Sequence, residues 1–295
     1  MRLDHPYTDH ETWLRGNVHT HTTETDGEYT IEETLAAYEA AGHDYLAISD
    51  HDLLIDPDDY RADTSLTLLP AVEVTANGPH VVHVGATDVV EPQADRQVVV
   101  DEIRAQDAVA IPAHPNWLGE YDHWPQGRLS DLTGYHGIEI YNGNIERSRG
   151  GALATARWDQ LLSAGKRVWA VGTDDAHGGV DVANAWTVVQ VPEQTPAAIL
   201  DALRAGRSYV STGVTIERID VEGTTIELET SDDVTARLVS DQGRIQRTVE
   251  GSTVRFDVSE DLVWGSDHTY VRIECFGRGT DVAWTQPFAL ADGSR

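Results

Sequence analysis

The sequence is poor in the features that mark secreted, membrane-spanning and cysteine-dependent proteins. Cys275 is the only cysteine among 295 residues, so the chain can form no intrachain disulfide and no cysteine-based zinc site. No apolar run approaches the roughly 18 residues needed to span a bilayer, and residues 1–5 do not open a signal peptide. From these absences we expect a cytoplasmic protein with no membrane partner.

Basic residues are scarce as well. The chain has 21 Lys and Arg residues against 50 Asp and Glu residues, a formal net charge of −29, and Lys166 is its only lysine. A field of this sign repels phosphate backbones, and we therefore expect no nucleic-acid partner. An acidic, lysine-poor surface is typical of proteins from salt-adapted organisms, where counterions screen the self-repulsion. We expect the stability of the fold to decrease at low salt.

Two kinds of hydrophobic pattern divide the chain. Up to residue 213, short apolar runs such as residues 44–48 alternate with helical patterns such as residues 98–106, which is typical of an α/β barrel. From residue 214 onward Thr, Val, Ile and Glu alternate with a period of two, which predicts an antiparallel β module. We therefore predict a barrel of residues 1–213 and a small β-rich module of residues 214–295. The role of this module and the oligomeric state stay open.

Side chains that bind metal ions follow many of the apolar runs. His19 and His21 alternate at the end of one strand, so both imidazoles face the same way. Asp175 and His177 repeat this spacing after the last clear strand of the barrel. Polar side chains at strand ends are where α/β barrels place their chemistry. Glu73 lies between two valines of an apolar run, where a buried carboxylate is costly unless it is paired or bound to metal. Nine such residues form the candidate ligand set: His19, His21, Asp26, His51, Glu73, His80, His114, Asp175 and His177.

This donor set favours a centre of two or three divalent ions. It contains only imidazole nitrogens and carboxylate oxygens, which suit zinc, manganese or iron. For any one motif, the competing interpretation is a partly buried histidine that is hydrogen-bonded to its neighbours. Histidines placed by chance would not follow nearly every apolar strand, so we expect a multinuclear metal site.

Two choices among neighbouring residues rest on spacing. His80 and His83 lie three positions apart and face opposite sides of a regular strand. We select His80 because it precedes the strand and lies beside the turn that follows Glu73. The Asp-x-His spacing selects Asp175 over Asp174, which would then support a ligand or form a salt bridge.

The segment after residue 137 carries candidate substrate contacts. The strand of residues 137–142 ends in Asn142, and Arg147 and Arg149 follow at the expected start of a helix. The two guanidinium groups could hold an anionic substrate, or they could form surface ion pairs. The excursion of residues 116–131 adds three aromatic residues that either line the access to the site or pack in the core: Trp117, Tyr121 and Trp124.

Taken together, these segments resemble the PHP (polymerase and histidinol phosphatase) superfamily. The matching segments read His-Thr-His, Thr-Asp-Gly, Ile-Ser-Asp-His, Ala-Val-Glu-Val, Pro-Ala-His-Pro and Gly-Thr-Asp-Asp-Ala-His, at residues 19–21, 25–27, 48–51, 71–74, 112–115 and 172–177. The resemblance covers about residues 14–213 and implies a distorted (β/α)7 barrel that holds two or three metal ions. The family more often has Ser-Asp-Gly where this chain has Thr25-Asp26-Gly27.

Two finer expectations come from the same resemblance. Residues 139–142, 174–177 and 208–213 look like the carbaryl-hydrolase-like branch, which has a similar β-rich tail and includes carboxyl- and carbamate-ester hydrolases. The superfamily pattern also implies three ion positions, with these ligands: His19, His21, Glu73 and Asp175 for the first, Glu73, His80 and His114 for the second, and Asp26, His51 and His177 for the third.

These expectations combine into a predicted function, which is metal-dependent hydrolysis of a small phosphate ester. Bound ions would lower the pKa of a water molecule and polarise the P=O or C=O group, so no serine nucleophile is required. The candidate catalytic residues are Asp175, His51 and His177, and either histidine could protonate the leaving group if its ion position is empty. Two alternatives stay open: a carboxyl-ester or carbamate hydrolase on the same metals, and a non-catalytic metal-binding module.

Overall fold

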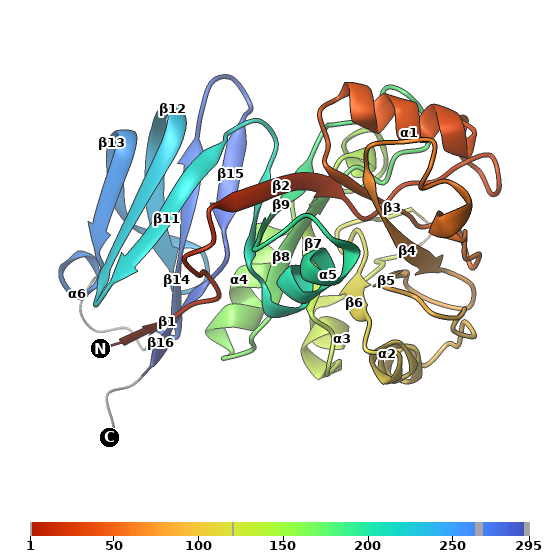
Figure 1. The fold of residues 1–295 in the computed structure, drawn as a ribbon. Coiled ribbons are helices and arrows are strands. Elements are labelled where there is room, and N and C mark those ends of the chain that lie inside the picture. The colour runs from red at the N-terminus through yellow and green to blue at the C-terminus, as the bar shows by residue number, and fades with distance from the viewer. Residues whose placement is uncertain (1, 120, 263–267, 292–295) are drawn as a thin grey trace.

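The molecule has an α/β part and a β module, which share one sheet (Figure 1). The computed structural model describes residues 2–119, 121–262 and 268–291. The strands of the α/β part are β2 (Thr12–Asn17), β3 (Tyr45–Ile48), β4 (Thr67–Val74), β5 (Val81–Val84), β6 (Val109–Pro112), β7 (Gly137–Asn142), β8 (Trp169–Thr173), β9 (Trp186–Val191) and β10 (Ser208–Ser211). Its helices are α1 (Ile31–Ala40), η1 (Pro57–Asp59), α2 (Arg96–Ala105), α3 (Gln126–Asp131), η2 (Asn144–Arg147), α4 (Thr155–Ser163) and α5 (Pro196–Ala205).

The β module is antiparallel, as its period-two pattern predicted. Its elements are β1 (Arg2–Asp4), β11 (Ile216–Glu222), β12 (Thr225–Ser240), β13 (Arg244–Asp257), α6 (Val258–Asp261), β14 (Tyr270–Phe276), β15 (Val282–Thr285) and β16 (Phe288–Ala291). The first strand of the chain belongs here because β1 pairs with β16, while β15 pairs with β10 and continues the sheet into the α/β part. The boundary at residue 213 stays a prediction. None of the described helices is long and apolar enough to cross a bilayer.

The α/β part contains a mixed sheet, and the predicted distorted (β/α)7 barrel is not found as a closed sheet among the described residues. Strands β2, β3 and β4 run parallel, whereas β5 is antiparallel to β4 and β6, and β9 is antiparallel to β2. Residues 75–80, which join β4 to β5, are fewer than the dozen or so that a parallel crossover needs. The parallel pair β7–β8 contacts β6, β9 and β10, but in the described ranges no ladder joins it to them.

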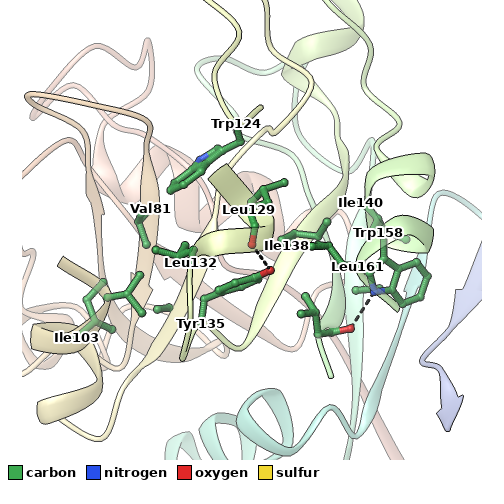
Figure 2. Close-up of a cluster of buried hydrophobic side chains, with 14 of the residues drawn as sticks. Val81, Ile103, Trp124, Leu129, Leu132, Tyr135, Ile138, Ile140, Trp158 and Leu161 are labelled. Atoms are coloured by element: carbon green, nitrogen blue, oxygen red, sulfur yellow. Dashed lines mark hydrogen bonds between the residues drawn. The ribbon is translucent and has the colours of Figure 1, made fainter. Parts of the chain in front are cut away.

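A buried aromatic core packs helices α3 and α4 beside β7 (Figure 2). The Tyr135 hydroxyl donates to the Leu129 carbonyl at 3.0 Å, and the indole nitrogen of Trp158 donates to the carbonyl of Val168 at 2.8 Å. Trp124 is fully buried in the same cluster, so it packs in the core and does not line an access path. Burial of one such side chain contributes roughly 1.5–3 kcal/mol, and this core therefore fixes the position of β7.

Candidate metal centre

Strand ends bring the predicted ligands to one edge of the sheet. They deliver His19 and His21 after β2, His51 after β3, Glu73 within β4, His114 after β6, and Asp175 and His177 after β8. His80 reaches the same edge from the start of β5, because the antiparallel direction of β5 places its start beside the end of β4. His83 does not join this cluster, and both of its buried ring nitrogens lack a hydrogen-bond partner among the described residues.

Glu73 lies at the centre of the cluster. Its Oε1 atom is 2.9 Å from His80 Nδ1 and 3.0 Å from His114 Nε2, and its Oε2 atom is 2.8 Å from His51 Nδ1. Burial would raise the pKa of Glu73, but the charges of His80 and His19 outweigh burial and hold this pKa well below its usual range. A buried, ionised carboxylate surrounded by imidazoles is suited to bridge two cations.

A second set of donor atoms has the spacing of a coordination shell. His19 Nε2 and His21 Nε2 lie 3.3 and 3.2 Å from the same Asp175 Oδ1 atom, and His19 Nε2 is 3.3 Å from Glu73 Oε1. Ligands bound tetrahedrally at about 2.0–2.1 Å from zinc stand roughly 3.3 Å from one another. These side chains can therefore hold a divalent ion in the positions that they already occupy.

A third set of donor atoms lies nearer to solvent. Asp26 Oδ2 is 3.3 Å from His51 Nε2, Asp26 Oδ1 is 3.5 Å from His177 Nε2, and the Asp26 side chain is 54% exposed. Hydrogen bonding by His177 and then by His51 holds the pKa of Asp26 well below its usual range, so the carboxylate is ionised. The ring of His177 stacks on that of His21, with centroids 4.3 Å apart, which connects this outer position to the inner one.

Buried atoms without hydrogen-bond partners test whether the cluster suits metal ions. An unpartnered buried polar atom costs about 1–3 kcal/mol, and divalent ions would satisfy several such atoms at once. Within the described ranges, the buried atoms at this site that form no hydrogen bond of acceptable geometry include His19 Nε2, His21 Nε2, His51 Nδ1 and Glu73 Oε2, although the last two lie 2.8 Å apart. The donors form overlapping groups, which include His19 with His21 and Asp175, His51 with Glu73 and His80, and His21 with Asp26, His51 and His177. The residues therefore fit divalent metal ions.

Two residues at this edge have a strained backbone. His114 has a φ angle of +31° and Asp175 a φ angle of +50°. Such left-handed conformations cost about 1–3 kcal/mol in residues other than glycine and concentrate at functional sites. The surrounding structure holds both residues in place, because the His114 amide donates to Glu139 at 2.6 Å and the Asp175 amide donates to the His19 carbonyl at 3.0 Å.

Glu139 is a buried carboxylate that the sequence analysis did not place in the site. It accepts hydrogen bonds from His19 Nδ1 at 2.6 Å, from the Thr173 hydroxyl at 2.7 Å and from the Asn142 amide at 2.8 Å. A carboxylate on Nδ1 fixes the tautomer and orientation of a ligating histidine, so His19 presents Nε2 to the cluster. The signal that could have found it is the one that identified Glu73, a charged residue inside an apolar strand.

His123 is a second residue that the sequence analysis missed. Its Nε2 atom accepts the backbone N–H of His80 at 2.7 Å, and its ring lies 4.9 Å from that of Trp117 and 5.3 Å from that of Tyr121. Burial, with the nearby charges of His114 and His80, lowers the pKa of His123 to about 2, so the ring is neutral. No local sequence pattern indicated His123, because it lies in an irregular segment that reaches the site only when the folded chain places it beside His80.

A pocket of about 180 Å3 opens beside the ligands. Trp117, one of the aromatic residues considered for the access path, lines it, and the Trp117 ring lies 5.2 Å from that of His114. Besides the predicted metal ligands, the walls are formed by Trp117, Asn144, Ile145 and Ser148.

The three predicted substrate residues are not among the residues that line this pocket. Asn142 is buried, and its amide donates to the carboxylates of Glu139 and Asp175. Arg147 forms an ion pair with Asp181, and Arg149 lies outside the pocket walls. The expected helix does not begin here either, because residues 144–147 form the short helix η2 and α4 begins only at Thr155.

Comparisons with known proteins agree with the resemblance seen in the sequence. Residues 170–208 match a family model described as PHP-associated. The structure matches a two-domain protein from Bacteroides vulgatus that contains a predicted PHP-like metal-dependent phosphoesterase, with a TM-score of 0.57 and 18% identity over 98% of each chain. These two findings support the PHP superfamily. At this identity the structural likeness shows a shared fold, which extends over both parts of the chain.

More distant structural matches cover the chain in part. PsfC from Pseudomonas syringae PB-5123 matches with a TM-score of 0.48 and 14% identity over 65% of this chain and 90% of that chain. The lesion-specific endonuclease PfuEndoQ from Pyrococcus furiosus matches with a TM-score of 0.44 and 14% identity over 65% of this chain and 56% of that chain. No curated protein matches the chain in sequence.

Proposed function

We propose that the protein is a metal-dependent phosphoesterase that hydrolyses a small phosphate ester. The observation that carries this proposal is the convergence of imidazoles from separate loops on the buried carboxylate of Glu73, with donor atoms left unpartnered. Bound divalent ions supply Lewis acidity, which lowers the pKa of water and polarises an ester group. Two or three ions of zinc, manganese or iron suit the donor set.

Two histidines are placed to handle protons. His51 and His177 are partly exposed, whereas His19 is fully buried, so the first two are within reach of a substrate. Against the effect of burial, Asp26 and Glu73 raise the pKa of His51 to about 10, which favours its acid form. Either exposed histidine can donate a proton to the leaving oxygen where it does not bind an ion.

The substrate in this proposal is a small molecule. The pocket volume of about 180 Å3 lies below the range of roughly 300–1,000 Å3 that is common for ligand sites. A net charge of −29 opposes the approach of a long phosphate backbone, whereas a single phosphate group can be neutralised locally by bound cations.

One observation favours a second candidate, a carboxyl-ester or carbamate hydrolase on the same metal centre. Within the described part of the chain, no arginine or lysine lines the pocket, while Trp117 and Ile145 add apolar surface. A phosphate dianion commonly receives hydrogen bonds from cationic side chains, but a neutral ester has no such need. The carbaryl-hydrolase-like segments of the sequence belong to this second candidate.

A substrate panel separates these candidates. The protein is loaded with zinc, manganese or iron and assayed with p-nitrophenyl phosphate, bis-p-nitrophenyl phosphate and 1-naphthyl acetate. We expect turnover of the phosphomonoester. Changes to residues that only support a ligand lower activity by up to about 100-fold, so Glu73→Gln, which changes a ligand itself, should lower kcat/KM by at least that factor. The exposed variant Glu39→Gln serves as the matched control and should keep the wild-type rate.

The other outcomes lead to the alternatives. Turnover of 1-naphthyl acetate without turnover of either phosphate ester would replace the phosphoesterase by the second candidate. Stoichiometric ion binding without turnover of any of the three substrates would favour a non-catalytic metal-binding module. A protein that binds no divalent ion would remove all of these functions.

A further inference from the structure

The segment after β8 carries His177 into the site, and its far end is firmly held. Asp174, the neighbour that the spacing argument set aside, accepts hydrogen bonds from the amides of Ala183, Asn184 and Ala185 at 2.8, 2.8 and 2.9 Å. This carboxylate therefore anchors the return of the segment into β9. It makes no such contact with the half of the segment that contains His177.

A different carboxylate holds that half. Asp181 Oδ2 accepts the backbone N–H groups of His177 and Gly178, both at 3.1 Å, and the Asp181 amide donates back to the Gly178 carbonyl at 3.0 Å. Asp181 is buried. A buried carboxylate is costly unless an opposite charge compensates it, so Asp181 requires a cationic partner.

Arg147 supplies that cation from the segment after β7. Its guanidinium group forms an ion pair with Asp181, and its Nη1 atom donates to the Val180 carbonyl at 3.3 Å. Arg147 belongs to η2, the short helix whose residues Asn144 and Ile145 line the pocket. The pair therefore joins the segment after β7 to the segment after β8.

The remaining ligands depend on other contacts. The ring of His19 is held by Glu139, and the backbone of Asp175 is held by the His19 carbonyl. His177 instead contributes to the outer ion position, where it lies 3.5 Å from Asp26. Loss of the Arg147–Asp181 pair would thus displace one ligand of the outer position and leave the inner donors in place.

We propose that Arg147 is a positioning residue that, through Asp181, holds His177 and so sets the affinity of the ion position formed by Asp26, His51 and His177. This role differs from the substrate contact that the sequence suggested for Arg147. It rests on the metal centre of the proposed function and is independent of which ester is hydrolysed.

The test counts and titrates bound ions in the full-length protein. Metal-depleted wild type, Arg147→Gln and Asp181→Ala are titrated with zinc or manganese by calorimetry, and bound ions per chain are measured by mass spectrometry after desalting. We expect both variants to bind one ion about 10–100-fold more weakly, the range for changes to groups that orient a ligand, with the other ions unaffected. Arg147→Lys should bind the ion more tightly than Arg147→Gln but more weakly than the wild type. Lysine keeps the positive charge but lacks the planar guanidinium group that can make two parallel hydrogen bonds to a carboxylate.

The matched control is Arg218→Gln in the β module. The side chain of Arg218 is 50% exposed and that of Arg147 is 47% exposed, and Arg218 is ion-paired with Asp220 and Glu229. The control therefore removes a comparable arginine that is far from the ligands in sequence. It should bind ions as the wild type does. A cooperative thermal unfolding transition in each protein shows that it is folded. If Arg147→Gln does not fold, the ion affinities of Asp181→Ala and Arg147→Lys are compared with that of the wild type instead.

Three results would overturn the proposal: unchanged ion number and affinity in the folded variants, an equal loss at every ion position, or no ion binding by the wild type. A selective loss of one ion in Arg147→Gln, in a protein that hydrolyses none of the three esters, would support the positioning role while removing the proposed function. The two proposals can therefore fail separately.

Discussion

The junction between the two parts and the metal centre both bury charged side chains, but those side chains bind different partners. At the junction, Arg272 of β14 donates two hydrogen bonds to Asp159 of α4, at 2.7 and 2.8 Å. The Tyr270 hydroxyl donates to the same carboxylate at 2.7 Å, and Glu274 accepts from Arg272 at 2.8 Å. These groups satisfy one another, so the cluster needs no further ligand.

At the metal centre, in contrast, several buried donor atoms form no hydrogen bond. The Nε2 atoms of His19 and His21 stand 3.3 and 3.2 Å from Asp175 Oδ1, and both lack a hydrogen-bond partner in the described structure. Native proteins leave few buried polar atoms unpartnered. A buried cluster whose charged groups all hydrogen-bond to one another stabilises the fold. A buried cluster whose donor atoms converge without partners is suited to bind a ligand.

The largest expected effect tests the junction. Arg272→Met leaves Asp159 buried without its charge partner, and we expect it to lower the free energy of unfolding by about 3–5 kcal/mol. Urea unfolding followed by circular dichroism measures this change. The double variant Asp159→Leu with Arg272→Met should recover most of the loss, and both folded proteins should bind ions as the wild type does. A single variant as stable as the wild type would break the comparison.

The next effect tests the metal centre. Glu139→Gln removes the charge that orients His19, and we expect ion affinity to fall about 10–100-fold, as for other carboxylates behind ligating histidines. Titration calorimetry with zinc or manganese measures the affinity, and the exposed variant Glu39→Gln is the control. Equal affinity in Glu139→Gln and wild type would show that Glu139 has only a packing role.

His83 sharpens the comparison, because it is buried and has no hydrogen-bond partner in the described ranges but lies outside the cluster. Burial lowers its pKa from 6.5 to about 4. The unfolded chain therefore takes up a proton below about pH 6.5 while the folded chain does not, and stability is lost as the pH falls from 6.5 towards 4. Between pH 7 and pH 5 this histidine should account for about 2 kcal/mol.

Unfolding of wild type and His83→Leu at both pH values isolates this contribution. Every other group is the same in both proteins, so only the difference between the two pH dependences belongs to His83. We expect the variant to lose less stability at pH 5. Equal pH dependence in the two proteins would contradict a neutral, merely packed His83.

The smallest expected effect is the dependence of thermal stability on salt. It arises from exposed charges that belong neither to the buried junction cluster nor to the metal centre. With 50 acidic against 21 basic residues, self-repulsion should destabilise the fold at low salt. Screening shortens the range of this repulsion from about 10 Å at 0.1 M salt to about 3 Å at 1 M. We expect the thermal midpoint to rise with potassium chloride concentration, and a midpoint independent of salt would remove this expectation.

Local patterns were sufficient to predict most of the residues that the structure brings together. The alternation of His19 with His21, and of Asp175 with His177, places each pair on one face of an extended segment. Glu73 was identified because an apolar strand rarely contains an unpaired carboxylate. Glu139 is also a carboxylate inside an apolar strand, so the same pattern indicates a functional role for Glu139.

Other features depended on which segments become neighbours. Arg147 was predicted to contact substrate, yet its guanidinium group pairs with Asp181 of the segment after β8. His123 joins the cluster from an irregular segment. The predicted distorted (β/α)7 barrel is not found as a closed sheet among the described residues, where the short connection of residues 75–80 makes β4 and β5 a hairpin.

The sequence by itself determined which side chains stand at the ends of the strands, because the spacing of polar and apolar residues along a strand is a local property. Only the tertiary structure decided that β5 presents His80 from its N-terminal end and that Glu139 orients His19. It also decided that Arg147 pairs with Asp181, which accepts the amides of His177 and Gly178. These contacts join residues far apart in the chain, and their free energy depends on burial that no single segment possesses before the chain has folded.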